Sequence, residues 1–473
     1  MQRQSRCPHS FLKQLFLLSF SALLHLQIAA ATEASGYDCS LWRPASSELT
    51  AKPTDPEYCS LSGVYTGWIA ATNLGDDLTC DMFYEVLRLA IQRKAPHATV
   101  TLEYDRQLTG RHISIPEIKQ EDLASADFLI MGGGSMLEIR DTPYTRICKV
   151  AGDLNLPVYY HGTGSQYPDS TNTMDIKAVK GAISVPLRFG GLRGRLGLER
   201  LQTINPEFVL PVIYDSALLT ARLFHLQPSL LSNKLKRERS PVACFAGTEH
   251  RVNQWFFGDG VEELDDAVAG FVNITRTNRV VLLPVDKTSM QRALQVQAAV
   301  LAQGVPAEEF LVNHAFTDWS VIMDIMSHCT VMFTDRLHGA ILSAASGTPF
   351  SFFVDDWTRF KQTDFSESVG QTNFQEPISD AFTKTMRAER LVETMVAIKA
   401  NRTMLVHDLN QHVSKAYDLH MAAMDKFVTY LLACRPSLQE SLDKALVVRV
   451  TGLRSKYFEG GVVTIDACDR PVV

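Results

Sequence analysis

An arginine and a histidine at the end of a predicted strand carry the clearest chemical signal in this sequence. The segment TDRLHGA, Thr334–Ala340, follows an apolar run and opens a helical pattern, and ligands of parallel sheets bind at such strand-to-helix junctions. Arg336 offers a planar fork that suits a carboxylate or a phosphate. His338 could transfer a proton or donate to a phosphate oxygen. The structural alternative is an Arg336 that is buried against Asp335 and a histidine that is satisfied in the core.

Glycine-bearing turns follow three predicted strands. NLGDD, Asn73–Asp77, precedes a helix, so its Asn and Asp side chains could cap that helix while free backbone N–H groups face an anion. Asp76 or Asp77 could also orient an acceptor hydroxyl, although helix capping is the favoured role. GGGS, Gly132–Ser135, follows the apolar run FLIM and permits close approach of the backbone to a ligand, with a tight turn as the alternative. A third turn, Gly162–Ser165, is a weaker example, and none of the three is a GxGxxG or Walker A loop.

A second histidine, His161 in the segment YHGTG, also follows a predicted strand. It is a candidate acid, base or substrate-binding residue, and a purely structural histidine is an equal alternative. Trp357, Phe360 and Phe365 could stack on a sugar face, although packing in the core is favoured. The sequence contains no carboxylate triplet or His/Cys cluster typical of a metal site, so we expect a protein that needs no metal.

These residues are positioned by an alternation of short apolar runs and helical patterns, which predicts parallel sheets covered by helices on both faces. Strands are expected at Gly63–Ile69, Ala98–Glu103, Asp127–Met131, Val158–Tyr160, Ala182–Leu187, Val242–Ala246, Val280–Pro284, Thr330–Phe333 and Pro349–Val354. Helices are expected at Leu78–Arg93, Tyr144–Leu154 and Ser289–Gln303, from His338 onward, and at Ala388–Leu432. The pattern therefore predicts an α/β protein.

The alternation runs twice along the chain, which predicts two doubly wound, Rossmann-like domains in a GT-B-like arrangement, with ligands near the carboxyl ends of the strands. The charged segment 229–240 is interpreted as an interdomain linker. The expected order is a signal peptide or signal-anchor (1–31), a stem (32–60), an N-terminal domain (61–228), the linker, a C-terminal domain (241–385), and a helical C-terminal extension with a tail (386–473).

Composition limits the class of protein. With 473 residues and 46% hydrophobic content, the chain can bury at least two substantial cores. The 27 glycines, 20 prolines and 21% charged residues exclude a collagen-like, coiled-coil or wholly disordered protein. The 46 basic and 52 acidic residues give a net charge of −6, which disfavours nucleic-acid binding.

The N-terminus indicates the secretory pathway. Basic residues precede an apolar run at Leu15–Ala31, which ends in alanines and fits either a cleaved signal peptide or a short signal-anchor. Sequons for N-glycosylation begin at Asn273 and Asn401. We therefore expect the rest of the chain to be lumenal or secreted.

The nine cysteines leave the disulfide pattern open, because pairing cannot be read from sequence. None forms a CxxC motif. Cys39/Cys59 and Cys434/Cys468 flank the main body of the chain and could form bridges. Three cysteines of the main body could equally be buried thiols, namely Cys148, Cys244 and Cys329.

The motifs occur in the order and approximate spacing of one enzyme family. NLGDD, GGGS and DRLHGA, together with VPLR at Val185–Arg188 and DSAL at Asp215–Leu218, resemble the motifs of the polysaccharide pyruvyl transferase family. Each motif is weak alone; their joint order carries the resemblance, which covers roughly Gly63 to Val354. Asp215-Ser216 stands where the family usually has Asp-Pro, and this difference changes the stiffness of the backbone more than the chemistry. The secretory N-terminus is similar to that of the eukaryotic, Golgi-located branch that pyruvylates galactose.

The resemblance implies transfer of a pyruvyl group from phosphoenolpyruvate to two hydroxyls of one sugar, which gives a cyclic ketal and phosphate. It implies that Arg188 and Arg336 grip the carboxylate and phosphate of the donor and that His338 is the general acid, with His161 as a second catalytic candidate. No cofactor besides the donor substrate is implied. The residues expected to bind substrate are Arg188, Gly133, Gly134, Ser135, Asn73, Asp76 and Leu337.

Two other functions stay open at this stage. A GT-B glycosyltransferase that uses a nucleotide sugar would share the architecture and the compartment, because fold does not settle function. A lumenal carbohydrate-binding protein without activity is the second alternative. Against it stands the presence of Arg188, Arg336 and His338 together, because sugar binding alone needs no such cationic set. The expected partner is a glycan or polysaccharide acceptor, with membrane contact only through an N-terminal anchor.

Overall fold

The computed structural model describes most of the chain between Tyr58 and Gly452. The described ranges are 58–67, 74–94, 99–104, 123–124, 126–137, 143–165, 173–224, 226, 228–237, 241–246, 264–284, 287–314, 318–354, 359–372, 375–377, 384–434 and 447–452. All of them belong to one compact unit, Trp42–Val473. The N-terminal apolar run and most of the expected stem lie outside these ranges. Within them, no helix has both the length and the apolar character of a membrane span.

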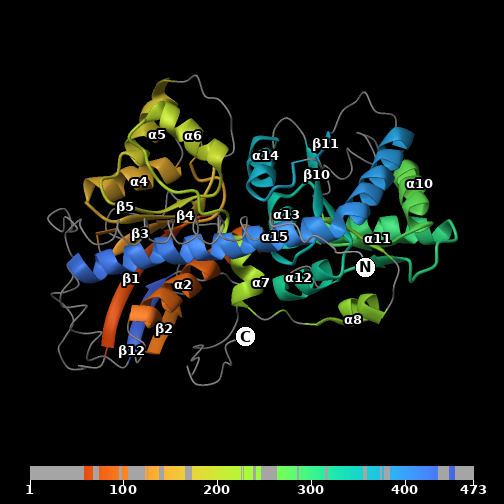
Figure 1. The fold of residues 1–473 in the computed structure, drawn as a ribbon, viewed down its shortest axis with the longest axis horizontal. Coiled ribbons are helices and arrows are strands. Elements are labelled where there is room, and N and C mark those ends of the chain that lie inside the picture. Colours follow the sequence, from red (N-terminus) through yellow and green to blue (C-terminus); the bar gives the residue numbers. More distant parts are fainter. Residues whose placement is uncertain are drawn as a thin grey trace, which may run out of the picture. The chain divides into compact units, whose positions relative to one another are not determined.

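The first sheet has six parallel strands in the order β2-β12-β1-β3-β4-β5 (Figure 1). Without β12 this is the strand order of a flavodoxin-like doubly wound sheet, whose ligands bind where the order reverses, between β1 and β3. The strand bounds are β1 Tyr58–Thr66, β2 Thr99–Tyr104, β3 Phe128–Met131, β4 Val158–Thr163, β5 Arg188–Leu192 and β12 Val447–Gly452.

Helices cover both faces of this sheet, because successive side chains of a strand point to opposite faces. Phe128 and Ile130 of β3 belong to the core that contains Phe83 of α2. Leu129 and Met131, which alternate with them, belong to the core lined by α4, α5 and α6. The helices of this domain are α2 Leu74–Lys94, α4 Pro143–Asp153, α5 Thr173–Ile183, α6 Arg195–Ile204, the 3-10 helix η5 Ser216–Leu219 and α7 Thr220–Leu223.

The second sheet also has six parallel strands, in the order β11-β10-β9-β6-β7-β8. Read from β8, this is the Rossmann order, and its reversal falls between β6 and β9. The strands are β6 Val242–Ala246, β7 Arg279–Leu282, β8 Phe310–Val312, β9 Val331–Thr334, β10 Phe350–Val354 and β11 Gln375–Pro377. The helices are α8 Leu230–Arg237, α10 Leu264–Thr275, α11 Lys287–Ala302, α12 Trp319–Ser327, α13 Leu337–Ala345 and α14 Arg359–Ser368. The structure is thus the expected pair of doubly wound domains in a GT-B-like arrangement.

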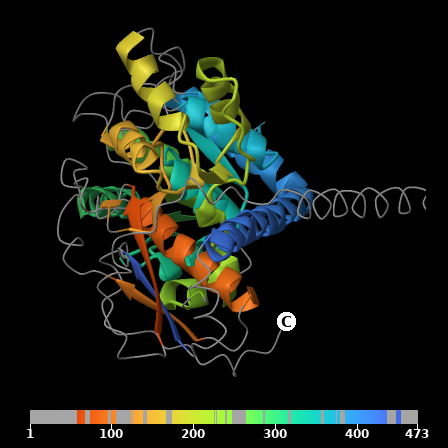
Figure 2. The same cartoon turned by 90° about the vertical axis from the view of Figure 1, so that its left-hand side faces the viewer.

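A 51-residue helix, α15 (Lys384–Cys434), leads the chain from the second domain back to the first. It packs on α10 and α13 of the second domain and on α2, η5 and β5 of the first, and α2 and α15 lie side by side in Figure 2. β12 then enters the first sheet between β1 and β2. The sequence predicted the helix correctly. It did not reveal β12, because both strands that pair with this short segment lie at the other end of the chain.

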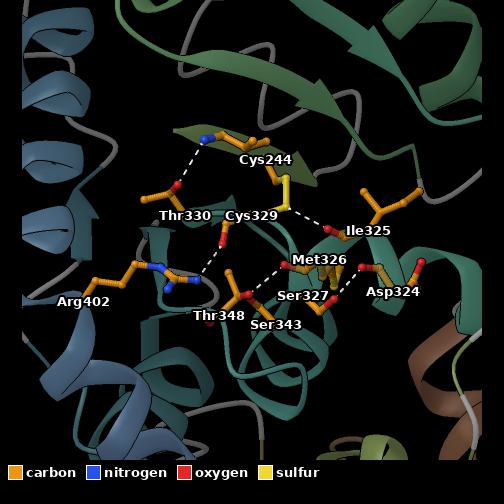
Figure 3. The surroundings of a disulfide bond; sticks show 11 residues. Cys244, Asp324, Ile325, Met326, Ser327, Cys329, Thr330, Ser343, Thr348 and Arg402 are labelled. Carbon is orange, nitrogen blue, oxygen red and sulfur yellow. Dashed lines mark hydrogen bonds between the residues drawn. A yellow bond between two sulfur atoms is a disulfide. The ribbon is translucent and has the colours of Figure 1, made fainter. Parts of the chain in front are cut away.

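A disulfide joins Cys244 of β6 to Cys329, which precedes β9 (Figure 3). The bridge ties together the two strands at which the order of the second sheet reverses. The guanidinium of Arg402 in α15 donates to the carbonyl oxygen of Cys329 at 3.5 Å. Cys148 is a buried free thiol. Cys434 is disulfide-bonded as well, and its expected partner lies outside the described residues.

Two predicted elements differ from the structure. Ala182 and Ile183 belong to the end of α5 rather than to a strand, and β5 starts only at Arg188. The sequence of β5, RFGGL, conceals the strand because it contains two glycines, of which Gly190 has a φ of 80°. The expected linker contains α8, which buries Leu235 in the core.

Candidate functional site

The reversal points of the two sheets bring the candidate motifs together at the carboxyl ends of the strands. In the first domain the GGGS turn follows β3, and α2 opens after β1. In the second domain Asp335 and Arg336 follow β9, and α13 begins at Leu337. Gly75 of α2 lies so close to His338 that a Cβ there would overlap the imidazole. The NLGDD and DRLHGA motifs therefore meet through this glycine.

Arg193, directly after β5, is the most deeply buried cation of the site, with 1% of its surface exposed. Its Nη2 donates to Ser135 Oγ at 3.3 Å, and its Nη1 lies 3.6 Å from Oδ2 of Asp215. Gly164 gives it room, since a Cβ at that position would overlap the guanidinium. Neither Nε nor Nη1 of Arg193 has a hydrogen-bond acceptor among the described residues. Buried guanidinium donors are normally satisfied, so these donors could also serve an anionic ligand.

Asp215 is a fully buried carboxylate that faces both domains. One oxygen, Oδ1, accepts from the backbone N–H of Ala217 at 3.0 Å and caps η5. The other, Oδ2, has no hydrogen-bond donor among the described residues. It lies 3.6 Å from Arg193 Nη1 and 4.0 Å from His338 Nε2. A buried carboxylate oxygen in this position can accept a hydrogen bond from a substrate hydroxyl or orient the imidazole.

The turn that carries Asp215 is held by the C-terminal helix. Tyr214 has a φ of 68°, a left-handed conformation that is unfavourable for a residue with a side chain. Its carbonyl oxygen lies 3.2 Å from Nε2 of His420 in α15. A carbonyl can only accept, so Nε2 of His420 carries the proton. Burial lowers the pKa of His420 to about 4, which keeps the ring neutral at physiological pH.

Arg336 and His338 occupy the start of α13, where free backbone N–H groups and the helix dipole favour an anion. Arg336 is the half-buried N-cap residue, and its backbone N–H donates to Thr334 Oγ1 at 3.0 Å. Leu337 and His338 are buried in the first turn, His338 with 8% of its surface exposed. Arg193, Asp215 and His338 thus converge, with Arg336 at the start of the same helix as His338. Such a set suits binding of a small anion and transfer of a proton.

The GGGS turn is explained mainly by packing within the protein. The Gly133 N–H donates to the hydroxyl of Tyr65 at 3.0 Å, and a Cβ on Gly132 or Gly133 would overlap Tyr65 or Thr79 respectively. Gly134 has a φ of 93°, which favours glycine. The tight-turn alternative therefore accounts for these glycines. The link from this turn to the site is the contact between Ser135 and Arg193.

His161 is fully buried in an aromatic environment. Its ring packs edge-on against Phe83 and His420, with centroid distances of 5.3 and 5.2 Å. Burial, followed by the neighbouring His420, lowers the pKa of His161 well below its ordinary value. The ring is therefore neutral near pH 7 and is not poised as a cationic acid. The arrangement supports the structural alternative for this histidine.

Arg188 does not join the other candidates, because it begins β5 instead of ending it. It donates to the carbonyl oxygen of Ile183 at 2.8 Å and lies over the ring of Phe208. The parallel strand then runs about 13 Å before its carboxyl end, where Arg193 follows. The sequence prediction placed this strand too early, at Ala182–Leu187, so that Arg188 stood at its expected carboxyl end. Arg193, which follows the carboxyl end of the actual strand, was missed for that reason.

The remaining candidates are the polar residues of the NLGDD motif and the three aromatic residues expected to stack on a sugar. Asn73 and Trp357 lie outside the described residues, as does the side chain of Asp76. Phe365 packs in the core against Phe350, with a centroid distance of 5.5 Å, and Phe360 lies beneath the guanidinium of Arg200. No group of three or more His, Cys, Asp or Glu side chains able to hold a metal occurs in the described part of the chain.

Fold and site together define a two-domain α/β protein with a cluster of charged residues at the strand ends. The sequence model of the polysaccharide pyruvyl transferase family matches residues 73–356. The chain therefore belongs to the polysaccharide pyruvyl transferase family. No curated protein matches it.

Solved structures with a similar fold have little sequence in common with this chain. The UDP-GlcNAc 2-epimerase of Neisseria meningitidis bound to UDP-GlcNAc has 8% identity and a TM-score of 0.47, and the match covers 79% of this chain and 99% of that one. UGT2 of Phytolacca americana, complexed with UDP-2fluoro-glucose and pterostilbene, has 11% identity and a TM-score of 0.45, and the match covers 79% of this chain and 100% of that one. MnaA of S. aureus with UDP has 10% identity and a TM-score of 0.47, and the match covers 81% of this chain and 97% of that one.

Proposed function

We propose that the protein transfers a pyruvyl group from phosphoenolpyruvate to two hydroxyls of one sugar of a glycan, and so forms a cyclic ketal and releases phosphate. The observation that carries the proposal is Arg193, a guanidinium that is almost completely buried and has donors without acceptors. Family membership supplies the reaction class. Arg336, the N-cap of the helix that carries His338, is the second fork in this proposal.

The donor needs this concentration of positive charge, because it carries a carboxylate and a phosphate on three carbons. Arg193 and Arg336 each present a fork that matches one of these groups. Fixing both groups orients the methylene carbon and removes most of the freedom of the reactant. The N-terminus of α13 stabilises the phosphate as its negative charge grows on departure.

His338 serves as the general acid in this proposal. It gives a proton to the methylene carbon, which becomes a methyl group and leaves an oxocarbenium-like centre for the first hydroxyl oxygen to attack. The C–O bond to phosphate then breaks, and the second hydroxyl closes the ring. Of the two hydroxyl protons, one replaces that given by His338 and the other leaves with phosphate. Asp215, 4.0 Å from His338 Nε2, orients the imidazole or accepts from a hydroxyl.

The compartment and the acceptor belong to the same proposal. The buried Cys244–Cys329 bridge supports folding in an oxidising compartment, and the apolar N-terminus and the two sequons support the secretory pathway. The resemblance to the Golgi-located branch favours galactose as the acceptor. We expect turnover to need neither a metal nor another cofactor and to survive exhaustive chelation.

Protein purified from a secretory host tests the proposal when it is incubated with phosphoenolpyruvate and a panel of galactosides, glucosides and N-acetylhexosamines. We expect stoichiometric phosphate release and a product whose mass and NMR spectrum correspond to a pyruvate ketal. Nucleotide sugars are offered in parallel. Transfer from a nucleotide sugar, or glycan binding that phosphoenolpyruvate neither alters nor converts, would refute the proposal in favour of a glycosyltransferase or a binding protein.

A further inference from the structure

Helix α14 contacts both turns that carry the site arginines. The side-chain amide of Gln362 donates to the carbonyl oxygen of Asp335, the residue before Arg336, at 2.9 Å. The carboxylate of Asp364 accepts from the backbone N–H groups of Leu196 at 2.9 Å and of Gly197 at 3.4 Å, shortly after Arg193. Gln362 is fully buried, and Asp364 is 2% exposed.

The two side chains leave α14 in opposite directions. Residues i and i+2 of a helix are rotated by about 200° and do not face each other. Gln362 therefore reaches the turn after β9 in its own domain, while Asp364 reaches the turn after β5 in the other domain. One turn of α14 spans the distance between the two arginine-bearing loops.

Asp364 caps the N-terminus of α6, which has no side-chain cap of its own. The N-cap residue of α6 is Gly194, which has no side chain to accept from the free N–H groups of the first turn. A Cβ on Gly194 would overlap the Asp364 carboxylate, so the glycine admits a cap from another helix. Its φ of −145° is open to any residue, so backbone strain does not require glycine here, whereas the closest approach of a Cβ would be to Asp364.

We propose that Gln362 and Asp364 are positioning residues that set the separation of the Arg193 and Arg336 turns, so that both guanidiniums can grip one donor molecule. The inference rests on the proposed function and extends it to a helix that begins after residue 356, where the family match ends. Neither residue needs to touch the donor. Gln362 acts through the backbone before Arg336, and Asp364 acts through the backbone after Arg193 and through its charge on that guanidinium.

Binding of one donor by two arginines requires the separation of their guanidiniums to be set precisely. The carboxylate and phosphate of the donor are held a fixed distance apart by its carbon frame. Two forks that come from different domains must match that distance, and a displacement of about 1 Å can cost on the order of 10²-fold in rate. A change in α14 should therefore weaken donor binding selectively. The glycan acceptor, which does not bridge the two arginines, should bind as before.

The test compares three single variants of the full chain on α14. D364N keeps the shape but replaces one of the two accepting oxygens with an NH2 group, which faces one of the two N–H groups. Q362M keeps the length but removes the amide. E367Q is the matched control, because it removes the charge from the exposed Arg195–Glu367 ion pair (3.3 Å) of the same α6–α14 contact and leaves the backbone contacts of Gln362 and Asp364 in place. Phosphoenolpyruvate affinity is measured by calorimetry, and KM for each substrate by phosphate release.

We expect D364N and Q362M to raise the Kd and KM for phosphoenolpyruvate about tenfold or more, with KM for the acceptor within twofold of wild type and E367Q unchanged. Should D364N fail to fold, Q362M carries the test. Unchanged donor affinity in the folded variants overturns the inference, and so does an equal rise in both KM values, which indicates a merely structural role. If wild-type protein itself does not bind phosphoenolpyruvate, the proposed function is what fails.

Discussion

The Nε2 atom of His338 lies 4.0 Å from Oδ2 of Asp215, and the same oxygen lies 3.6 Å from Nη1 of Arg193. One buried carboxylate therefore stands between a histidine of the second domain and an arginine of the first. It can orient both groups at once, which explains why the DSAL segment belongs to the site as well as to the cap of η5.

We predict that Asp215→Asn lowers kcat on the order of 10²-fold or more without unfolding the protein. Asparagine caps helices about as well as aspartate, so the hydrogen bond from Ala217 N–H survives and only the charge beside His338 and Arg193 is lost. The measurement is the rate of phosphate release together with Tm. Asp318→Asn is the control, since Asp318 caps α12 in the same way outside the site. Equal rates in the two variants would remove Asp215 from the mechanism.

A pair of variants tests whether the donor is bound by Arg193, as the structure indicates, or by Arg188, as the sequence pattern predicted. Arg193→Lys should reduce kcat/KM for phosphoenolpyruvate by about 10²-fold, because a point charge replaces a buried fork. Arg188→Lys should stay within a few-fold of wild type, since its guanidinium binds the carbonyl of Ile183 at the other end of β5. Steady-state kinetics with varied donor decide the matter. The reverse ranking of the two variants would show that the donor lies at the amino end of the strand.

The sequence predicted the architecture because buried parallel strands are apolar runs that need no tertiary information. It also placed Arg336 and His338 correctly at the junction between the strongly apolar β9 and the helix that follows. Arg193 was not predicted, because the glycines of β5 weaken the strand pattern that would have marked its end. The roles of His420 and Asp364 could not be read from any local pattern, because each acts on a segment more than a hundred residues away.

Gly75→Ala should inactivate the enzyme by moving a histidine. The added Cβ would overlap the imidazole of His338, so we expect a loss of kcat comparable to that of His338→Ala, on the order of 10²–10⁴-fold. Gly181→Ala in α5 is the matched control, because its Cβ would meet nothing closer than 3.9 Å. Phosphate release measures both. Full activity in a folded Gly75→Ala variant would contradict the contact between the NLGDD and DRLHGA motifs.

The Cys244–Cys329 bridge should contribute strongly to stability. It closes a loop with a sequence separation of 85 residues, and the chain-entropy model gives about 4.6 kcal/mol for a loop of this size. We expect the double variant Cys244→Ala/Cys329→Ala to unfold at a clearly lower urea concentration than the oxidised wild type, and reduction of the wild type to have a similar effect. An unchanged urea midpoint in the double variant would contradict the prediction.

Stability should fall as the pH drops below about 6.5, because two buried histidines resist protonation. The pKa of His420 is about 4 in the folded state and that of His161 is also lowered, in both cases chiefly by burial. Their ordinary value in the unfolded chain is about 6.5. Between these values the unfolded state binds more protons than the folded state. Each histidine therefore lowers the free energy of unfolding by up to about 1.4 kcal/mol per pH unit as the pH falls. Above pH 6.5 both states hold the histidine neutral, and this loss of stability is absent.

His420→Gln should make the free energy of unfolding depend less steeply on pH between 6.5 and 4, by about one proton. The glutamine amide keeps a donor for the Tyr214 carbonyl, which His420 contacts at 3.2 Å. His420→Met also loses the titration, but it leaves that carbonyl unpaired and should cost about 1 kcal/mol more at pH 7.5. Urea unfolding at several pH values measures both effects. A wild-type slope in His420→Gln would mean that His420 takes up its proton equally in the folded and unfolded chain. Equal stability of the Gln and Met variants at pH 7.5 would mean that the hydrogen bond does not hold the Tyr214 turn.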